Sequence, residues 1–493
     1  MMHETGESYT SIVAVKPPNN DAGATPVSAE AGEPRGVPAW NLQRDAKIRA
    51  QIRATLHTRL LRVRQKAETD KQVQFTTLWH HVYEPDRLAE TFFRLRKDGA
   101  VGVDRVDWQT YAANLEANIR ALSARLKRGA YHAKPVRRAY ILKMDGTRRP
   151  LGITTLEDKL VQRTTAEVLS AIYETDFLDC SYGFRPGRGP HDALDRVTVS
   201  LEREKISWVL DIDIRAFFDS IDHEWLITFV QHRVTDSRVI RHLKKWLRAG
   251  VLEKGQVQVA DYGSPQGGSI SPLMANIYLH YALDKWAMVW KREHATGEMR
   301  LVRFADDVVV GFQSRKDAEQ FQAALRVRLA RFHLELHPEK TRLIEFGRFA
   351  AANRRARGEH GSPATFDYLG FTHSCCTTST GHFCVLRTTR RKKVQAKIQE
   401  IALELRQRIS DSVPLVGTWL RQVLQGHYQY YGVPYNMDAL RAFRDEVVRR
   451  GKRVLSRRSQ LGYVTWERMN RLVKRWIPKP KLTHPFPNQR LIV

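Results

Sequence analysis

The sequence lacks the features that mark several protein classes. Four cysteines in 493 residues are too few for a disulfide framework. No run of ~18 uninterrupted apolar residues occurs, so the sequence predicts no membrane-spanning helix. The first residues show no basic segment followed by an apolar core and a small-residue cleavage site, which argues against a secretory signal. We therefore expect an intracellular protein that does not contact a membrane.

Acidic residues are scarce relative to basic ones. The chain has 81 Lys and Arg against 53 Asp and Glu, which gives a formal net charge of +28. Hydrophobic residues still make up 42% of the chain, which excludes global disorder. The length corresponds to roughly two to four domains. A positive excess of this size predicts a polyanionic partner, and nucleic acid is the commonest one.

The excess charge is concentrated in residues 386–493, where 24 Lys or Arg stand against 7 Asp or Glu, a net charge of +17. Basic runs at residues 390–393, 449–453 and 457–458 repel themselves unless an anion compensates them. The aromatic residues between these runs suit either base stacking or a helical core. They are Trp419, Tyr428, Tyr430, Tyr431, Trp466 and Trp476. We favour a nucleic-acid surface.

Changes of pattern divide the chain into four parts. Residues 1–39 contain five Pro and four Gly without apolar periodicity, and we expect a disordered leader there. Residues 40–97 are predicted to form a basic helical N-terminal extension. Residues 98–385 alternate helices with strands, which indicates an α/β part. Residues 386–493 are predicted to form a separate helical part.

Five strands are predicted within the α/β part. Residues 136–142 and 148–153 flank an Asp-Gly dipeptide, a strong short-range signal for a β-hairpin. Residues 208–214 form a short β-rich run. Residues 300–304 and 308–312 are two strands joined by an Ala-Asp-Asp turn.

Three carboxylates lie at the ends of these strands. Asp213 lies at the end of the predicted strand 208–214. Asp306 and Asp307 occupy the turn between the predicted strands 300–304 and 308–312. Paired Asp residues at a turn are commonplace, because Asp suits turns. A cluster of carboxylates in so basic a chain nevertheless requires a cation. Oxygen ligands suit Mg²⁺, and two Mg²⁺ ions about 3.5–4 Å apart are the phosphoryl-transfer arrangement of polymerases.

Seven motifs occur in a fixed order along the chain. They are Arg149-Pro-Leu-Gly-Ile153, Tyr182-Gly-Phe-Arg-Pro-Gly-Arg188, Asp211-Ile-Asp-Ile-Arg-Ala-Phe-Phe-Asp-Ser-Ile-Asp-His223, Gly263-Ser-Pro-Gln-Gly-Gly-Ser-Ile-Ser-Pro272, Phe304-Ala-Asp-Asp307, His337-Pro-Glu-Lys-Thr341 and Phe366-Asp-Tyr-Leu-Gly-Phe371. Each is weak alone, but their order and spacing resemble the reverse transcriptases encoded by bacterial group II introns. The basic tail resembles the thumb and maturase domain of that family. The turn has Phe304 where Tyr is commoner in the family, which keeps the ring.

The resemblance implies a fold and an activity. The fold would be an α/β right-hand polymerase (fingers and palm) with a helical N-terminal extension and an all-α thumb/maturase domain. The activity would be RNA-directed DNA polymerisation by a nucleotidyltransferase with two Mg²⁺ ions. The family's metal carboxylates correspond to Asp213, Asp306 and Asp307. Lys340 corresponds to the lysine that protonates or neutralises the leaving pyrophosphate.

The resemblance also implies a group of substrate-binding residues. Phe218 falls where the family has an aromatic ring beneath the incoming sugar, which would select deoxynucleotides; the alternative is a core ring, with Phe217 as the sugar contact. Lys143 and Arg149, on opposite arms of the predicted hairpin, resemble the residues that grip the triphosphate, although two cations at a hairpin tip also suit solvent. Gln266 lies where its amide would contact the nascent base pair.

Two arginines beside glycines complete the implied set. Arg185 and Arg188 are placed to approach template or nucleotide phosphates. Surface arginines in a loop are nearly as good an interpretation of the same pattern.

The leading functional hypothesis is a bacterial cytoplasmic protein that copies its intron RNA into DNA and assists splicing. Its partners would be the intron RNA template, a DNA primer or target and deoxynucleoside triphosphates. One alternative is a domesticated reverse transcriptase in phage defence or DNA repair, and another is an RNA-binding maturase without polymerase activity. No cysteine follows Cys384. The chain therefore resembles the endonuclease-lacking members of the family, and we expect no intrinsic DNA cleavage.

A second cluster offers a competing metal site. His373, Cys375, Cys376, His382 and Cys384 flank a Thr- and Ser-rich turn and resemble zinc ligands on a hairpin. Their spacings match no standard zinc finger. We therefore rank zinc well below a plain strand pair.

Overall fold

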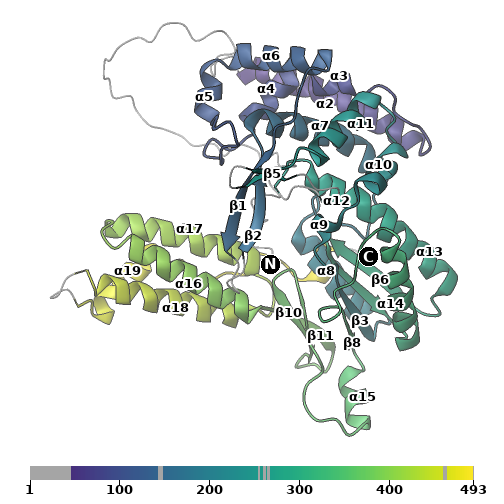
Figure 1. Cartoon of the computed structure of the whole chain (residues 1–493). Helices are drawn as coiled ribbons and strands as arrows, with labels where there is room; N and C mark the ends of the chain where they lie inside the picture. The colour runs from purple at the N-terminus through teal and green to yellow at the C-terminus, as the bar shows by residue number, and fades with distance from the viewer. Residues whose placement is uncertain are drawn as a thin grey trace.

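The fold is described by a computed structural model covering residues 46–142, 148–253, 256–258, 263, 267–458 and 463–491. The expectations for the leader and for Lys143 and Gln266 lie outside the described residues. Figure 1 shows N-terminal helices above, a sheet-containing body, and a layer of C-terminal helices. Within the described ranges, no helix combines the length and the apolar character needed to cross a membrane.

Helices precede, cover and follow the sheets. The N-terminal ones are α2 (Ala46–Thr69), α3 (Trp79–Val82), α4 (Pro85–Phe93), α5 (Trp108–Ala113), α6 (Leu115–Arg128) and α7 (Leu156–Tyr173). The middle ones are α8 (Pro190–Arg203), α9 (Phe217–Ser220), α10 (His223–Gln231), α11 (Ser237–Leu247), α12 (Ser271–Leu279), the π-helical turn η1 (His280–Asp284), α13 (Lys285–His294), α14 (Arg315–Ala330) and α15 (Ala350–Ala356). The C-terminal ones are α16 (Arg391–Gln407), α17 (Val413–Tyr431), α18 (Met437–Leu455), α19 (Trp466–Trp476) and α20 (Pro487–Arg490).

The strands of the described residues form three sheets. The finger sheet has the order β2 (Arg148–Ile153), β1 (Val136–Leu142), β4 (Val251–Glu253) and β5 (Gln256–Gln258). The central sheet has the order β6 (Met299–Phe304), β7 (Asp307–Phe312), β3 (Trp208–Asp213) and β8 (Arg342–Glu345). The third sheet consists of β11 (Phe383–Thr389), β10 (Phe371–Thr377) and β9 (Phe366–Tyr368). The five strands predicted from the sequence are confirmed, each within one residue.

The central sheet is buried on both faces. Its neighbouring strands are all antiparallel, so side chains alternate between the faces with a period of two. One face contributes Leu210, Ile212, Leu301, Val308 and Val310 to a core shared with α14 and the N-terminal helices. The other face contributes Val209, Val302, Phe304, Val309 and Ile344 to a second core shared with α8, the third sheet and the C-terminal helices.

Buried polar contacts fix the N-terminal extension to the body. Asp236, at the start of α11, accepts hydrogen bonds through Oδ2 from the backbone N–H groups of Leu78 (2.6 Å) and Trp79 (2.9 Å). Arg233 donates to the carbonyl of Ala67 at the end of α2 (2.9 Å) and pairs with Asp176 (3.2 Å). These groups are buried, so the extension is packed into the first core.

The boundary expected at residue 385 is displaced. β11 continues to Thr389 and pairs with β10 along its length, from Phe383 opposite Thr377 to Thr389 opposite Phe371. The helical part therefore begins at α16. The sequence concealed this because the basic run that starts at Arg390 directly follows the strand.

His373 is buried in the middle strand of the third sheet. Its ring stacks on Phe366 with a centroid distance of 4.6 Å and an interplanar angle of 7°. Burial, and then the neighbouring charge of Arg387, lower the pKa of His373 to about 3. The folded protein therefore holds this ring neutral, whereas the unfolded chain protonates it below about pH 6.5.

Replacing His373 should reduce the acid sensitivity of the fold. As pH falls from 6.5 towards 3, protonation of the unfolded chain lowers the free energy of unfolding, by about 2 kcal/mol at pH 5 for this histidine. His373→Phe preserves the ring stack and removes that term. We expect thermal unfolding followed between pH 7.5 and 5 to show a smaller drop in Tm for the variant. His382→Phe, at the exposed turn of the same hairpin, is the control, and an equal drop in both variants would contradict the assignment.

Candidate active site

Two of the expected carboxylates face each other across adjacent strands. Asp213, the last residue of β3, lies directly opposite Asp307, the first residue of β7. Residues directly opposite one another share a face of the sheet, which here is the face of Val209 and Val309 that packs into the second core. Asp306 is the second residue of the two-residue turn between β6 and β7 and directly precedes Asp307. The structure therefore brings the three sequence-predicted carboxylates to one end of the central sheet.

The electrostatics of this cluster oppose full ionisation without a cation. Burial, and then the charge of Asp306, raise the pKa of Asp307 well above its usual range. Asp211 lies on the same face, two residues before Asp213, and burial raises its pKa to about 6 although Arg342 pairs with it at 3.3 Å. Sequence reasoning gave Asp211 no role. The two-residue spacing from Asp213 was the available signal.

The loop before β8 is joined to the end of β3. The backbone N–H of His337 donates to the carbonyl of Asp213 (2.8 Å), and Thr341 Oγ1 donates to the same carbonyl (3.3 Å). Lys340 is thereby held so that its Nζ lies 3.6 Å from Asp213 Oδ2, with half of the side chain exposed. Its ammonium group is close to the carboxylates and accessible to a ligand.

The donor set fits Mg²⁺ as part of a larger site. Among the described residues, no three His, Cys, Asp or Glu side chains are grouped closely enough to hold a metal by themselves. Mg²⁺ usually takes only one or two protein carboxylates and completes its shell with water and substrate phosphates. The paired oxygens of Asp213 and Asp307, with Asp306 adjacent, match that mode of binding.

The two adjacent phenylalanines take different positions. Phe217 is 2% exposed and lies edge-on to Tyr278 in the first core, at 6.5 Å between ring centroids. Phe218 is half-buried. Ala216, just before them, has a φ of +44° that turns the chain out of β3. Of the two rings, only Phe218 retains exposed surface for a sugar, which is the arrangement that its expected role requires.

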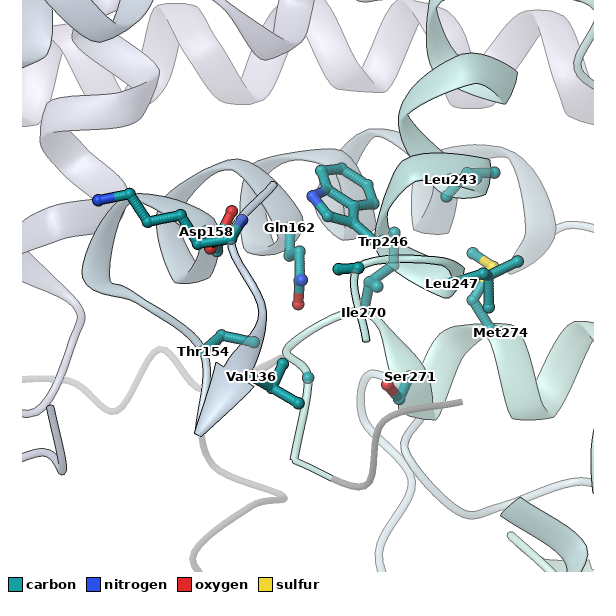
Figure 2. Close-up of a pocket in the computed structure, with 13 residues that line it drawn as sticks. Val136, Thr154, Asp158, Gln162, Leu243, Trp246, Leu247, Ile270, Ser271 and Met274 are labelled. Carbon is teal, nitrogen blue, oxygen red and sulfur yellow. Dashed lines mark hydrogen bonds between the residues drawn. The ribbon is translucent and has the colours of Figure 1, made fainter. Parts of the chain in front are cut away.

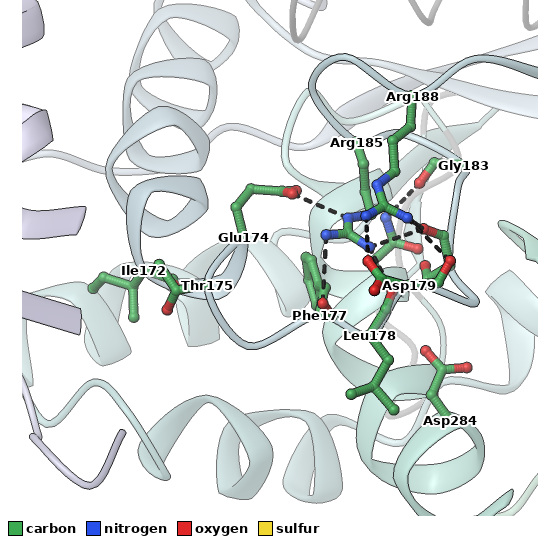
Figure 3. Close-up of polar contacts among 12 residues, drawn as sticks. Ile172, Glu174, Thr175, Phe177, Leu178, Asp179, Gly183, Arg185, Arg188 and Asp284 are labelled. Atoms are coloured by element: carbon green, nitrogen blue, oxygen red, sulfur yellow. Dashed lines mark hydrogen bonds and ion pairs between the residues drawn. The ribbon is translucent and has the colours of Figure 1, made fainter. Parts of the chain in front are cut away.

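The structure corrects the expectation for Arg185. Its Nε donates to Glu174 (3.0 Å), and its Nη1 donates to the carbonyls of Leu178 (2.7 Å) and Ser181 (2.8 Å), as Figure 3 shows in part. The side chain is 4% exposed. These contacts use its donors inside the loop, so a direct phosphate contact by Arg185 is not supported.

Arg188 is also engaged but less deeply. It pairs with Asp179 at 2.6 Å (Figure 3). Its guanidinium also lies over the ring of Tyr182, and 27% of the side chain is exposed. The partner carboxylate of Asp179 is almost fully exposed. An exposed ion pair is weak, so a phosphate can compete for Arg188.

The remaining predicted contacts concern the finger sheet. Arg149 lies in β2 directly opposite Ile141 of β1. Its side chain, like Lys143 and Gln266, lies outside the described residues, so their roles stay predictions. Figure 1 places the β1–β2 hairpin between the N-terminal helices and the C-terminal helices.

A small cavity lies beneath the finger sheet. Figure 2 shows Val136, Thr154, Gln162 and Trp246 among the residues that line it. Its volume of about 20 Å³ accommodates roughly one water molecule and is too small for a nucleotide. This cavity is therefore not a candidate for the nucleotide site, and the carboxylates remain the candidate.

The five candidate zinc ligands are divided by the third sheet. Cys376 lies directly opposite Cys384 and shares its face, whereas His373 and Cys375 lie on the other face. Cys375 Sγ accepts a hydrogen bond from the backbone N–H of Gly347 (3.4 Å). A ligand set divided between two faces of a sheet does not favour zinc.

The C-terminal aromatic residues separate into two groups. Tyr428 and Tyr431 are 4% and 1% exposed and belong to the second core, so they are unavailable for stacking. Trp466 is 50% exposed, and Lys452 lies 5.1 Å from its ring centroid. The basic surface near α18 and α19 therefore keeps an exposed aromatic ring.

Comparison with known proteins shows which proteins the middle of the chain is similar to. Residues 141–373 match the reverse transcriptase (RNA-dependent DNA polymerase) family, which implies a right-hand polymerase fold. The group II intron-encoded protein LtrA of Lactococcus lactis subsp. cremoris is 36% identical over 233 residues, which are 47% of this chain and 38% of that protein. Protein YkfC of Escherichia coli (strain K12) is 37% identical over 220 residues, which are 43% of this chain and 58% of that protein.

A eukaryotic relative is similar over a shorter segment. An uncharacterized 91 kDa protein in the cob intron of Schizosaccharomyces pombe is 42% identical over 168 residues, 34% of this chain and 20% of that protein. The chain thus spans less than two thirds of the length of each of these relatives. Within that span, residues 141–373 are similar to the reverse transcriptase family, and the chain is similar to proteins encoded in group II introns.

Proposed function

We propose that the protein is an RNA-directed DNA polymerase that binds its own intron RNA, assists splicing and copies that RNA into DNA. The observation that carries the proposal is the placement of Asp213, Asp306 and Asp307 together at one end of the central sheet of a reverse transcriptase domain. All three carboxylates are present, which argues against a maturase without polymerase activity. Relatives named as intron proteins favour an intron role over a domesticated enzyme.

The chain's own residues divide the work of the reaction. Asp213 and Asp307 offer oxygens on one face of the sheet, and Asp306 offers a third carboxylate beside them. Two Mg²⁺ ions held there would lower the pKa of the attacking 3′-hydroxyl and stabilise the charge of the in-line transition state. Lys340, beside Asp213, neutralises the leaving pyrophosphate. Phe218 contacts the sugar of the incoming nucleotide.

The C-terminal helices supply the proposed RNA-binding surface. Arg449 and Arg450 of α18 share one carboxylate, Glu446, at 3.2 and 2.7 Å, and Arg453 is exposed one turn further along. One acidic group cannot compensate three guanidinium groups. The remaining positive charge is available for phosphates.

Removing a proposed metal ligand should abolish DNA synthesis. Asp213→Ala or Asp306→Ala should lower the rate of primer extension on an RNA template by roughly 10³-fold or more, because cation stabilisation of the transition state is worth several kcal/mol. RNA affinity, measured by filter binding, should be unchanged. Glu319→Ala, which removes an exposed carboxylate of α14, is the control, and polymerisation retained in either ligand variant would refute the assignment.

Opening the space under the sugar should relax nucleotide selection. Phe218→Ala should raise incorporation of ribonucleotides relative to deoxynucleotides by about tenfold or more, since a clash with the 2′-hydroxyl of at least ~1.4 kcal/mol is removed. Single-nucleotide incorporation assays measure both rates. Phe217→Ala, which truncates the buried ring, should instead lower Tm. If Phe217→Ala gives the ribonucleotide phenotype, we have assigned the wrong ring.

Reversing charge on α18 should weaken RNA binding. The triple variant Arg449→Glu, Arg450→Glu, Arg453→Glu should bind intron RNA at least about tenfold more weakly. The slope of log K against log salt should become shallower by about 0.7 for each single-strand phosphate that the variant no longer neutralises. Extension of a short non-specific primer–template should suffer less. The control is a second triple variant on α13 and α14, which combines Lys291→Glu, Arg292→Glu and Lys316→Glu. It changes the net charge of the protein by the same amount as the α18 variant. Equal weakening in both triple variants would mean that only total charge matters.

A further inference from the structure

Arg303 lies three residues before Asp306, near the end of β6. Its side chain is completely buried next to the Ala305–Asp306 turn between β6 and β7. Its Nε and Nη2 donate to the two carboxylate oxygens of Asp284 at 2.8 and 2.6 Å. Nη2 also donates to Ser181 Oγ (2.7 Å), and Nη1 donates to Asn276 Oδ1 (2.9 Å) and to the carbonyl of Ala305 (2.9 Å). The guanidinium has five N–H donors, and these hydrogen bonds occupy all of them.

The contact with Ala305 is made to a strained residue. Ala305 has a φ of +55°, a left-handed conformation that residues with a Cβ rarely adopt. Two-residue hairpin turns that begin with a positive φ normally place glycine there. Such strain persists only where the surroundings over-determine the conformation. Arg303 holds the carbonyl of this residue, and the next residue is Asp306.

A second contact braces the same turn from the Tyr182–Gly183 segment. A Cβ at Gly183 would lie 2.3 Å from the backbone nitrogen of Ala305, so only glycine allows this approach. Asn276 Nδ2 donates to the carbonyl of Gly183 (2.7 Å), while its Oδ1 accepts from Arg303. The Tyr182–Gly183 segment and the Ala305–Asp306 turn are thus connected through Asn276 and the guanidinium of Arg303.

The position of Asp284 depends on an unusual helix segment. Asp284 is the last residue of η1, the π-helical turn between α12 and α13. Such segments are rare and occur frequently at functional sites. Asn276 lies on α12, just before this turn. One short helical region therefore supplies two of the three side chains that bind Arg303, and Ser181 supplies the third.

Stability alone is a poor reason for this arrangement. A buried ion pair gives up its hydration and is often no more stabilising than apolar residues of similar volume. Arg303 faces the first core, as its register partner Val308 does, whereas Asp307 faces the other side of the sheet. It therefore does not contact the metal-binding oxygens itself, and acts on them through the backbone of the turn.

We infer that Arg303, oriented by Asp284 and Asn276, is a positioning residue that holds the Ala305–Asp306 turn in the conformation that binds the cation. The inference rests on the proposed function, because it assigns these carboxylates to metal binding. Residues that orient metal ligands from outside the coordination shell are known in other metal sites. Mutating such an orienting residue typically lowers metal affinity or activity by about 10–100-fold.

The test measures metal binding separately from catalysis. Arg303→Lys keeps the charge but removes the planar fork. We expect Mn²⁺ binding to the full-length protein, followed by electron paramagnetic resonance, to weaken about 10–100-fold. The Mg²⁺ concentration for half-maximal primer extension should rise by a similar factor. Affinity for the primer–template should stay within about twofold, which a general loss of structure would not allow. Asp306→Ala defines the Mn²⁺ signal of a damaged site.

Two further variants make the result decisive. Arg300→Lys alters a guanidinium on the same strand that pairs with Glu204 through two hydrogen bonds (3.0 and 2.8 Å) away from the turn, and it should leave Mn²⁺ binding unchanged. If Arg303→Lys does not fold, Asn276→Ala provides a second test. It keeps the Arg303–Asp284 pair and removes the hydrogen bonds of Asn276 to Arg303 and to the carbonyl of Gly183. We expect Mn²⁺ affinity to decrease about tenfold. Unchanged Mn²⁺ affinity in the folded variant overturns the inference. A wild-type protein that binds Mn²⁺ but makes no DNA overturns the proposed function instead.

Discussion

The alternation of side chains along the central sheet is the constraint on which the rest of the structure depends. Because both faces are buried, each strand must present apolar side chains on both sides, and a slip of one residue would exchange the two faces. The short turn between β6 and β7 sets the register in which Asp307 lies opposite Phe304 and Asp213. The arrangement of the carboxylates is therefore enforced by two hydrophobic cores and does not depend on interactions among the carboxylates, which repel one another.

The same burial of both sheet faces joins the C-terminal helices to the part of the sheet that carries the carboxylates. Phe304 and Val309, on the carboxylate face of the sheet, share the second core with Leu424 and Tyr431 of α17. The chain after α19 also returns to α8, where Arg490 pairs with Asp192 and Asp195. The position of the basic surface relative to Asp213 and Asp307 is thus fixed by apolar packing together with a polar contact. If α18 binds RNA as proposed, this packing would present the RNA to the sheet at a defined place.

Local patterns in the sequence were sufficient for five of the strands, but not for the remaining strands of the described residues or for contacts between distant segments. The β-hairpins follow from alternation and from short turns, so their bounds were predictable. Arg185 was misjudged because flanking glycines suggested an exposed loop, while its partner Glu174 lies on the preceding segment and is revealed only by the fold. The same holds for Arg303 and Asp284, which are 19 residues apart in the sequence and meet where Asp284 ends the π-helical turn η1. Tyr428 and Tyr431 illustrate the converse, since interleaved aromatic and basic residues do not reveal which rings face a core.

The opposite charges of the two functional surfaces give the proposed reaction an order. The basic C-terminal helices attract a polyanion without a metal, because counterion release from phosphates favours binding to Lys and Arg. At the central sheet the same phosphates meet Asp213, Asp306 and Asp307, which repel them. Burial strengthens this repulsion, and it already raises the pKa of Asp307. A primer end and a triphosphate can therefore occupy the site only together with cations, whereas RNA can be held at α18 without them. The protein's own charge distribution would in this way separate the proposed binding of RNA from the proposed catalysis on it, which is what a chain that serves both splicing and DNA synthesis requires.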